Sequence, residues 1–144
     1  MRALLDVNVL IALLDAAHVH HREATRWLEA EIGNGWASCP LTQNGCIRIM
    51  AQPGYPGAFR AAEVAERFGE ATADPAHEFW AADRSLLDAD TIDWSHVLGH
   101  RQITDAYLLA LAVQHGGRFA TFDRNVPRAA VPGAKAHHLV VLES

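Results

Sequence analysis

Several features that would assign this chain of 144 residues to a class of protein are scarce or missing. Its two cysteines, Cys39 and Cys46, are too few for the disulfide framework of a small secreted domain, and their spacing matches no zinc-binding pattern. No N-terminal segment resembles a signal peptide, and the apolar run 106–113 is far shorter than the ~20 residues that a membrane span needs. We therefore expect a soluble, cytoplasmic protein with no membrane association.

Lysine is also scarce, because the cations are eleven arginines and the single Lys135. We attribute this bias mainly to a GC-rich genome, although arginine also binds phosphate through two parallel hydrogen bonds. The formal net charge of -5 argues against the broad basic surface of a nonspecific nucleic-acid coat protein. A local arginine-lined groove beside an acidic pocket remains compatible with that charge.

Half of the residues are hydrophobic, and the length suits one domain, residues 1–144, with a core of its own. Apolar segments with strand and helix patterns alternate along the chain. The expected strands are 2–6, 36–39, 77–80, 119–122 and 138–142, and the expected helices are 8–15, 20–32, 41–50, 58–68 and 105–114. Asn8 and Thr104 are the expected N-caps of the first and last helices. This alternation predicts an α/β fold, a three-layer α/β/α sandwich with a mostly parallel central sheet.

Three aspartates stand where expected strands end or helices begin. Asp6 follows the apolar run 3–5, Asp123 follows 119–122, and Asp105 opens the last helix. Because the carboxyl ends of parallel strands border the ligand crevice, we expect these side chains to form one acidic site. Clustered carboxylates repel one another unless one is protonated or a cation joins them, and oxygen ligands suit Mg²⁺ or Mn²⁺.

The segments around these aspartates resemble three motifs of the PIN-domain nucleases, in the family's order. Residues 4–11 resemble the opening motif, 104–112 the third acidic motif and 120–124 the fourth. The chain length and the sequences of these motifs are most similar to those of the VapC toxins of bacterial toxin–antitoxin pairs. The resemblance implies a metal-dependent endoribonuclease that yields a 5′-phosphate and a 3′-hydroxyl by water attack. It also implies a small antitoxin partner whose C-terminal arm folds onto the cleft, and we expect a homodimer.

The resemblance assigns roles to single residues. Asp6, Asp105 and Asp123 are the expected catalytic and metal-binding residues; the metal would activate a bound water, and Asp123 either completes the coordination or orients that water. The family's usual glutamate, six residues after a strand serine, falls on Asn44, whose amide brings no charge and should weaken a second metal most. The other expected participants are Asn8 and Thr104 as supporting residues and Arg124 as a phosphate contact.

Other interpretations stay open on the sequence alone. Asp105 is favourable at a helix N-terminus whatever the function, and Asp123 could be a simple turn residue. A haloacid-dehalogenase-type phosphatase would use Asp6 as a covalent nucleophile, but Asn8 stands where that class has a second carboxylate. A catalytically inactive PIN-like binding module is the other alternative, suggested by Asn44.

Three further groups of residues are expected to have structural roles. The histidines 18, 20 and 21 are expected in a solvated loop or helix start, because they lack the ligand set of a zinc site. The four tryptophans are expected to pack, with Trp94 as the exception to watch for base stacking. The helix 58–68, with Val64 and Phe68, is the candidate for part of a dimer surface.

Overall fold

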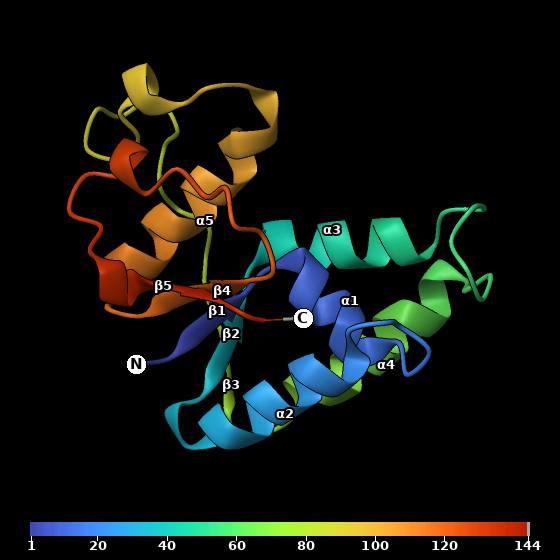
Figure 1. Ribbon diagram of the computed structural model, residues 1–144. Coiled ribbons are helices and arrows are strands. Elements are labelled where there is room, and N and C mark those ends of the chain that lie inside the picture. Colours follow the sequence, from blue (N-terminus) through green and yellow to red (C-terminus); the bar gives the residue numbers. More distant parts are fainter. Residues whose placement is uncertain (144) are drawn as a thin grey trace.

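A computed structural model describes residues 1–143, and its centre is a parallel sheet (Figure 1). The five strands of this described part are β1 (Ala3–Leu5), β2 (Trp36–Ser38), β3 (His77–Phe79), β4 (Arg118–Thr121) and β5 (Leu139–Val141). They are ordered β3-β2-β1-β4-β5, and every neighbouring pair is parallel. The order reverses between β1 and β4, so the ends of these two central strands border the crevice where ligands bind in open α/β sheets.

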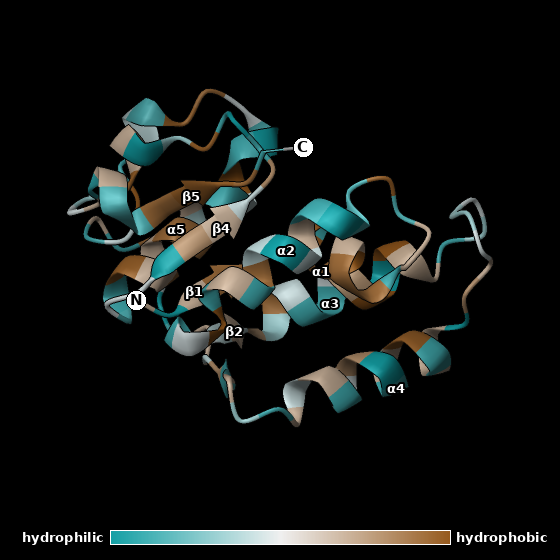
Figure 2. Cartoon of the chain, turned by 60° about the horizontal axis from the view of Figure 1, so that its bottom comes forward, coloured by the Kyte–Doolittle hydropathy of each residue, from teal (hydrophilic) through white to brown (hydrophobic). Residues whose placement is uncertain are grey.

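Helices cover both faces of the sheet, as expected of a three-layer sandwich. The helices are α1 (Val7–Leu14), α2 (His21–Glu31), α3 (Pro40–Met50), α4 (Ala61–Thr72) and α5 (Ile103–Gln114). Alternate residues of β1 point to opposite faces: Ala3 and Leu5 join the core formed with α1–α4, whereas Leu4 joins the core around α5. Figures 1 and 2 show α5 on one side of the sheet, and the hydrophobic colour of α1 and α5 against the mixed colour of α2 and α4.

Helix α5 is buried along most of its length, from Asp105 to Ala112. The segments on its outer side carry Ile92 and Val131, which are buried in the same core. Short 3₁₀ turns complete the described part: η1 (Ile32–Asn34), η2 (Trp94–His96), η3 (His100–Gln102), η4 (Arg128–Ala130) and η5 (Ala136–His138). A helix enclosed on all sides is apolar on every face, which is the pattern of this stretch.

Both expected helix caps were wrong. Asp6, not Asn8, is the N-cap of α1, and its Oδ1 accepts a hydrogen bond of 2.7 Å from the backbone N–H of Val7. Helix α5 begins at Ile103, directly after η3, so Thr104 lies inside the first turn with an exposed side chain. Helix α1 thus begins at another good capping residue, Asp6, two positions before Asn8, whereas α5 has no side-chain cap at all.

The helix expected at 58–68 runs from Ala61 to Thr72 instead. Its start is displaced because Ala58 has a left-handed φ of 50°, which is incompatible with a helix. Val64 and Phe68 are 1% and 3% exposed and belong to the core, so they cannot form a dimer surface. Leu41 is 43% exposed at the start of α3. The last strand is shorter than expected, because η5 occupies its first position.

Within the described residues, no helix combines the length and the apolar character that crossing a bilayer requires.

Candidate active site

Asp6 occupies the single position between β1 and α1, and it is only 7% exposed. Its backbone N–H donates to the carbonyl of Ala120 on β4 at 2.9 Å, which extends the sheet register by one residue. Its carboxylate accepts from the Val7 N–H through Oδ1 and from the Thr121 hydroxyl through Oδ2, the latter at 2.6 Å. Burial raises the pKa of Asp6 above its ordinary value, although these two hydrogen bonds oppose the shift.

Asp105 is buried in the first turn of α5 and faces the other two aspartates. Burial is the largest cause that raises its pKa, to about 8; the charge of Asp6 and the contact with the Asp123 carboxyl raise it further. A carboxyl group with that pKa is protonated at neutral pH in the absence of a cation. The three aspartates predicted to share a site therefore act on one another electrostatically, across 117 positions of sequence from Asp6 to Asp123.

Thr121 organises the site, although the sequence did not single it out. This fully buried residue at the end of β4 donates to Asp6, and its hydroxyl oxygen accepts the Asp123 N–H at 2.9 Å. Asn8 braces the same region, because its amide donates to Thr121 Oγ1 at 3.4 Å and its Oδ1 accepts the Phe122 N–H at 3.3 Å. A threonine two residues before a strand-end aspartate was the available signal for this role.

The donor set suits a hard divalent cation, because the carboxyl groups of Asp6, Asp105 and Asp123 lie near enough to affect one another electrostatically. Within residues 1–143, however, no group of three or more His, Cys, Asp or Glu side chains is gathered closely enough to enclose an ion. Asp105 contacts the Asp123 carboxyl, and the charges of all three aspartates act on one another. Burial and the neighbouring carboxyl groups both raise the pKa of Asp105, and a cation between these groups would offset both effects, so the residues fit such a site chemically.

Asn44 lies on α3 with an exposed side chain. Helix α3 passes close to the start of α1, because a Cβ placed on Gly45 would lie only 2.7 Å from Cγ2 of Val7, the residue after Asp6. The neighbouring Gln43 turns elsewhere, and its amide donates to the Ser38 hydroxyl, which is also 2.8 Å from His77 Nε2. Asn44 is thus more exposed to solvent than Gln43, and its neighbour Gly45 approaches the end of α1 that follows Asp6.

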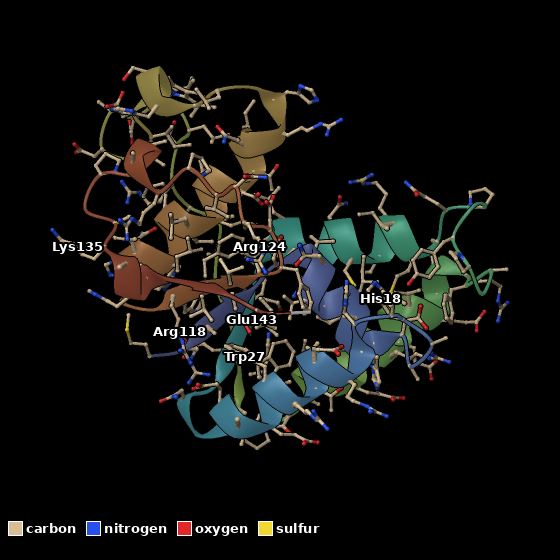
Figure 3. All side chains as sticks on the ribbon, viewed as in Figure 1. His18, Trp27, Arg118, Arg124, Lys135 and Glu143 are labelled. Atoms are coloured by element: carbon tan, nitrogen blue, oxygen red, sulfur yellow. The ribbon has the colours of Figure 1, made fainter. Side chains whose placement is uncertain are left out.

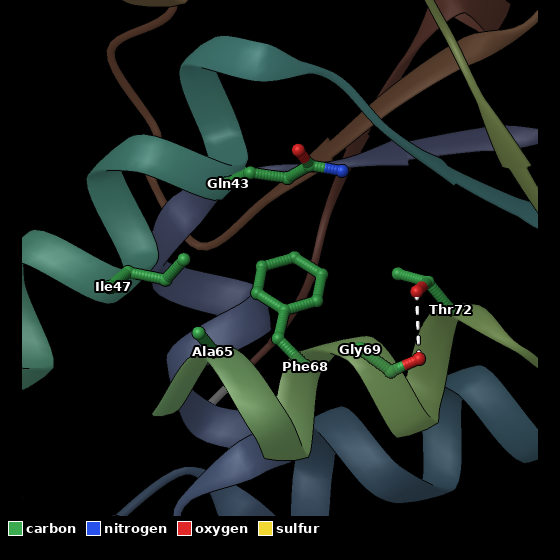
Figure 4. Close-up of a pocket in the computed structure, with 6 residues that line it drawn as sticks. All are labelled: Gln43, Ile47, Ala65, Phe68, Gly69 and Thr72. Atoms are coloured by element: carbon green, nitrogen blue, oxygen red, sulfur yellow. Dashed lines mark hydrogen bonds between the residues drawn. The ribbon is translucent and has the colours of Figure 1, made fainter. Parts of the chain in front are cut away.

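A hollow of about 170 Å³ between α3 and α4 is a separate feature (Figure 4). Gln43 and Phe68 line it, and Thr72 donates to the Gly69 carbonyl at its edge. None of its lining residues is charged, so it is not part of the acidic site.

The other residues singled out from the sequence are Arg124, Trp94 and the three histidines, and they lie on different segments. Arg124 is exposed directly after Asp123, beside the end of β4 (Figure 3). Trp94 is 42% exposed, and its indole N–H donates to the Leu86 carbonyl at 3.1 Å, on the η2 segment outside α5. The three histidines lie at the start of α2, as expected, but they are half-buried. His20 stacks on Phe122 with ring centroids 5.0 Å apart, and His21 Nδ1 lies 2.7 Å from the Ala12 carbonyl.

Comparison with known proteins agrees with this geometry. Residues 3–132 match the PIN domain family. The chain belongs to the PIN-domain family. Within it, the chain belongs with the VapC ribonucleases: it is 51% identical over 142 residues to Ribonuclease VapC44 of Mycobacterium tuberculosis, which covers 99% of this chain and 100% of that protein. Ribonuclease VapC39 of the same organism is 40% identical over 134 residues, covering 92% and 96%.

A solved PIN-family structure shows the same fold. The crystal structure of Mycobacterium tuberculosis VapC20, described as a Sarcin-Ricin loop cleaving toxin, superposes with a TM-score of 0.61 over 85% of this chain and 89% of that one. At 12% sequence identity this similarity shows the fold and nothing about the substrate. The three-layer PIN-like sandwich predicted from the sequence is thereby confirmed.

Proposed function

We propose that this PIN-domain ribonuclease is the toxin of a type II toxin–antitoxin pair and that it cleaves RNA by metal-dependent hydrolysis at Asp6, Asp105 and Asp123. One observation carries the site assignment: the buried Asp105 faces both other carboxylates, and its pKa is raised to about 8. Perturbed carboxyl groups cluster at functional sites, and the carboxyl edge of a parallel sheet is where ligands bind in open α/β folds. Family membership supports the reaction type.

Each aspartate has a defined part in this proposal. Asp6 and Asp105 would hold Mg²⁺ or Mn²⁺, and Asp123 would either complete the coordination or orient the attacking water. When bound, the cation supplies a Lewis acid that polarises the phosphate and lowers the pKa of a water. Asp105 must release its carboxyl proton to serve as a ligand, so we expect cation affinity to rise with pH.

The surrounding residues keep these groups in place. Thr121 fixes one Asp6 oxygen by its hydroxyl hydrogen bond, and Val7 fixes the other through its backbone N–H. The second role of Thr121, as acceptor for the Asp123 N–H, couples the two strand ends. Preorganised ligands of this kind avoid reorganisation during the reaction.

Two outer residues complete the proposal. Arg124 is exposed beside Asp123, where a guanidinium can pair with a phosphate oxygen of the RNA. Asn44 takes the position of the family's usual glutamate and would ligate only through a neutral carbonyl oxygen. We therefore propose a site with one strongly bound cation and weak occupancy of any second position.

The decisive experiment compares Asp6→Asn and Asp105→Asn with the exposed control Asp90→Asn. We expect the wild type and the control to cleave RNA in Mg²⁺, to lose activity in a chelator and to leave 5′-phosphate ends, whereas both site variants are folded and inactive. Full activity of either site variant would remove that residue from the proposed ligands. Cleavage by the wild type that continues unchanged in the chelator would refute the metal dependence.

Two alternatives give different results in the same experiment. A catalytically inactive binding module would bind RNA in Mg²⁺ without cutting it. The phosphatase alternative is not favoured, because the chain matches the PIN domain over residues 3–132 and carries Asn8 where the phosphatase class needs a carboxylate. It would predict phosphate release from small phosphomonoesters and a covalent intermediate on Asp6.

Regulation by a partner is part of the proposal. We propose a small cytoplasmic antitoxin whose C-terminal arm folds onto the acidic site and places a basic side chain against Asp6 and Asp105. A homodimer with twofold symmetry is proposed as well, through apolar surface other than Val64 and Phe68. Co-expression with the adjacent small gene, followed by sizing, tests both; an unbound, active monomer would refute them.

A further inference from the structure

A cavity of about 380 Å³ lies at the far end of α1, where the turn 15–20 meets the loop 51–60. Its walls are mainly apolar and aromatic, and a few polar groups converge on it. Six of the residues that line it set its chemistry: Asp15, His18, Val19, Tyr55, Gly57 and Phe59. Concave apolar sites with a few placed polar groups are the usual form of a small-ligand or nucleobase site.

Asp15 brings a buried carboxylate to this cavity. The residue is only 7% exposed, and no cationic side chain of the described part forms an ion pair with it. Oδ2 accepts the Tyr55 hydroxyl at 2.6 Å and Oδ1 accepts the Ala17 N–H at 3.0 Å. An ionised carboxylate offers about four acceptor sites, so two protein donors leave capacity for a ligand that donates N–H groups.

The wall of the cavity formed by residues 57–59 includes two residues with a positive φ. The guanidinium of Arg67 lies 5.3 Å from the centre of the Phe59 ring, and Gly57 packs against that ring with a φ of 104°. A Cβ at position 57 would lie 2.9 Å from the Phe59 side chain. Ala58 is the one non-glycine residue with a left-handed φ among those described, at 50°. Residues in such strained conformations cluster at active sites and ligand-binding sites.

A row of aromatic rings joins the cavity to the acidic site. Phe122, directly before Asp123, stacks on His20 with centroids 5.0 Å apart and planes inclined by 29°. His20 in turn lies 5.7 Å from His18, which lines the cavity. Asp6 and Asp15 flank the eight residues of α1 and are nine positions apart, which corresponds to about 14 Å at ~1.5 Å per residue. Figure 3 shows Arg124 and His18 at these two ends of α1.

His18 has a defined hydrogen-bonding state. Burial, followed by the neighbouring His20, lowers its pKa, so the ring is neutral at pH 7. Its Nδ1 accepts the His20 backbone N–H at 3.0 Å, and the proton therefore resides on Nε2. The cavity thus offers a carboxylate acceptor from Asp15, an imidazole donor from His18 and aromatic faces from Tyr55 and Phe59.

We propose that this cavity is a nucleobase subsite for the RNA strand cut at the aspartates, and that it prefers guanine. The inference rests on the proposed ribonuclease function. Guanine is the base whose Watson–Crick edge places two adjacent N–H donors, on N1 and N2, beside a carbonyl acceptor, which matches a carboxylate next to an imidazole N–H. Stacking on exposed aromatic rings is the usual way in which proteins hold unpaired bases. The rings of His20 and Phe122 would support the strand between subsite and scissile phosphate.

The test measures RNA binding by the cleavage-deficient Asp105→Asn protein, so that binding is separated from catalysis. Single-stranded oligouridines carrying one guanine at successive positions are titrated by fluorescence anisotropy, with adenine and cytosine at the same positions as comparison. We expect one position at which guanine binds about 10-fold more tightly than uridine, within the ~5- to 150-fold range of a good base contact. Adding Asp15→Asn should reduce that preference to about twofold or less, whereas adding the exposed Asp90→Asn should leave it unchanged.

Two more variants keep the test decisive if Asp15→Asn does not fold. Phe59→Leu keeps the hydrogen bonds of Asp15. It should weaken RNA binding severalfold whichever base stands at the selected position, because it removes a stacking face. Tyr55→Phe keeps both the ring and the carboxylate and should retain the guanine preference. Loss of preference in Tyr55→Phe, or none in Asp15→Asn and Phe59→Leu, would overturn the subsite.

The outcomes also separate this inference from the function on which it rests. If the wild type cleaves RNA but guanine is preferred at no position, the subsite is refuted and the ribonuclease stands. If the wild type neither binds nor cleaves any RNA, both are refuted. If Asp15→Asn leaves RNA binding unchanged but weakens binding of the antitoxin, the cavity serves a protein partner and the inference is wrong.

Discussion

The Thr121 hydroxyl donates to the Asp6 carboxylate at 2.6 Å, joining residues 115 positions apart in the sequence. The bond ties the ends of β1 and β4, the two central strands between which the sheet order reverses. Thr121 also accepts the Asp123 N–H, so a single buried hydroxyl fixes the positions of two of the three aspartates. The geometry of the site therefore depends on a residue that has no charge and no expected part in the chemistry.

Thr121→Val should damage both stability and activity. Valine has a similar shape, but it leaves an Asp6 oxygen and the Asp123 N–H without their buried partner, which costs about 1–3 kcal/mol. We expect that loss in urea unfolding and a large fall in the rate of RNA cleavage. Thr121→Ser keeps the hydroxyl and is the matched control, expected to retain most of the activity. A Thr121→Val protein as stable and active as the wild type would contradict the role assigned to this hydrogen bond.

The raised pKa of Asp105 makes the metal-free fold sensitive to pH. The folded protein keeps the Asp105 proton up to about pH 8, whereas the unfolded chain loses it near the ordinary value of 3.8. The folded state thus binds more protons between these two values, and the free energy of unfolding must fall as pH rises through that window. In a chelator we expect a loss on the order of 4 kcal/mol between pH 5 and pH 8, because each pH unit in this window corresponds to about 1.4 kcal/mol.

Asp105→Asn removes the titrating group and should flatten this dependence, so that the variant is the more stable protein at pH 8. The exposed Asp90→Asn should follow the wild type. Chemical unfolding at five or six pH values checks the prediction. Parallel curves for the wild type and Asp105→Asn would show that Asp105 titrates normally.

Gly45→Ala tests the close approach of α3 to the start of α1. In an exposed helix, alanine would stabilise by about 1 kcal/mol relative to glycine. Here a Cβ would lie 2.7 Å from Cγ2 of Val7, and overpacking of this kind costs about 1–3 kcal/mol. We expect a net loss of stability and reduced cleavage, because Asp6 is next to Val7. Combining Gly45→Ala with Val7→Ala should recover part of the loss in a double-mutant cycle; strictly additive effects would contradict the contact.

Asn44→Glu should strengthen cation binding. The change restores a carboxylate at the position that usually carries one in the family, next to a site that already holds three. Calorimetric titration of Mg²⁺ or Mn²⁺ into the wild type and the variant measures the difference. Arg48→Gln, one turn further along α3 and also exposed, is the charge-matched control, because it too lowers the net charge by one. Unchanged or weaker binding in Asn44→Glu, or an equal gain in both variants, would place Asn44 outside the coordination sphere.

The sequence by itself determined the layered α/β fold and the three aspartates. Strand and helix periods are local properties of the chain, and strands linked by helices must run parallel, so residues that follow them gather at one edge of the sheet. That is why Asp6 and Asp123 could be identified from apolar runs of only three and four residues, and why the resemblance to PIN motifs around them could be recognised.

Only the tertiary structure decided how these residues are supported. Two helix starts were misplaced. Asp6, at the end of β1, caps α1 in place of Asn8, and η3 leads directly into α5 before Thr104. The roles of Thr121 and of Val64 and Phe68 depend on which surfaces other segments cover. The raised pKa of Asp105 likewise arises from burial and from charges distant in sequence. Such long-range contacts and desolvation follow from packing, which no local pattern in the sequence encodes.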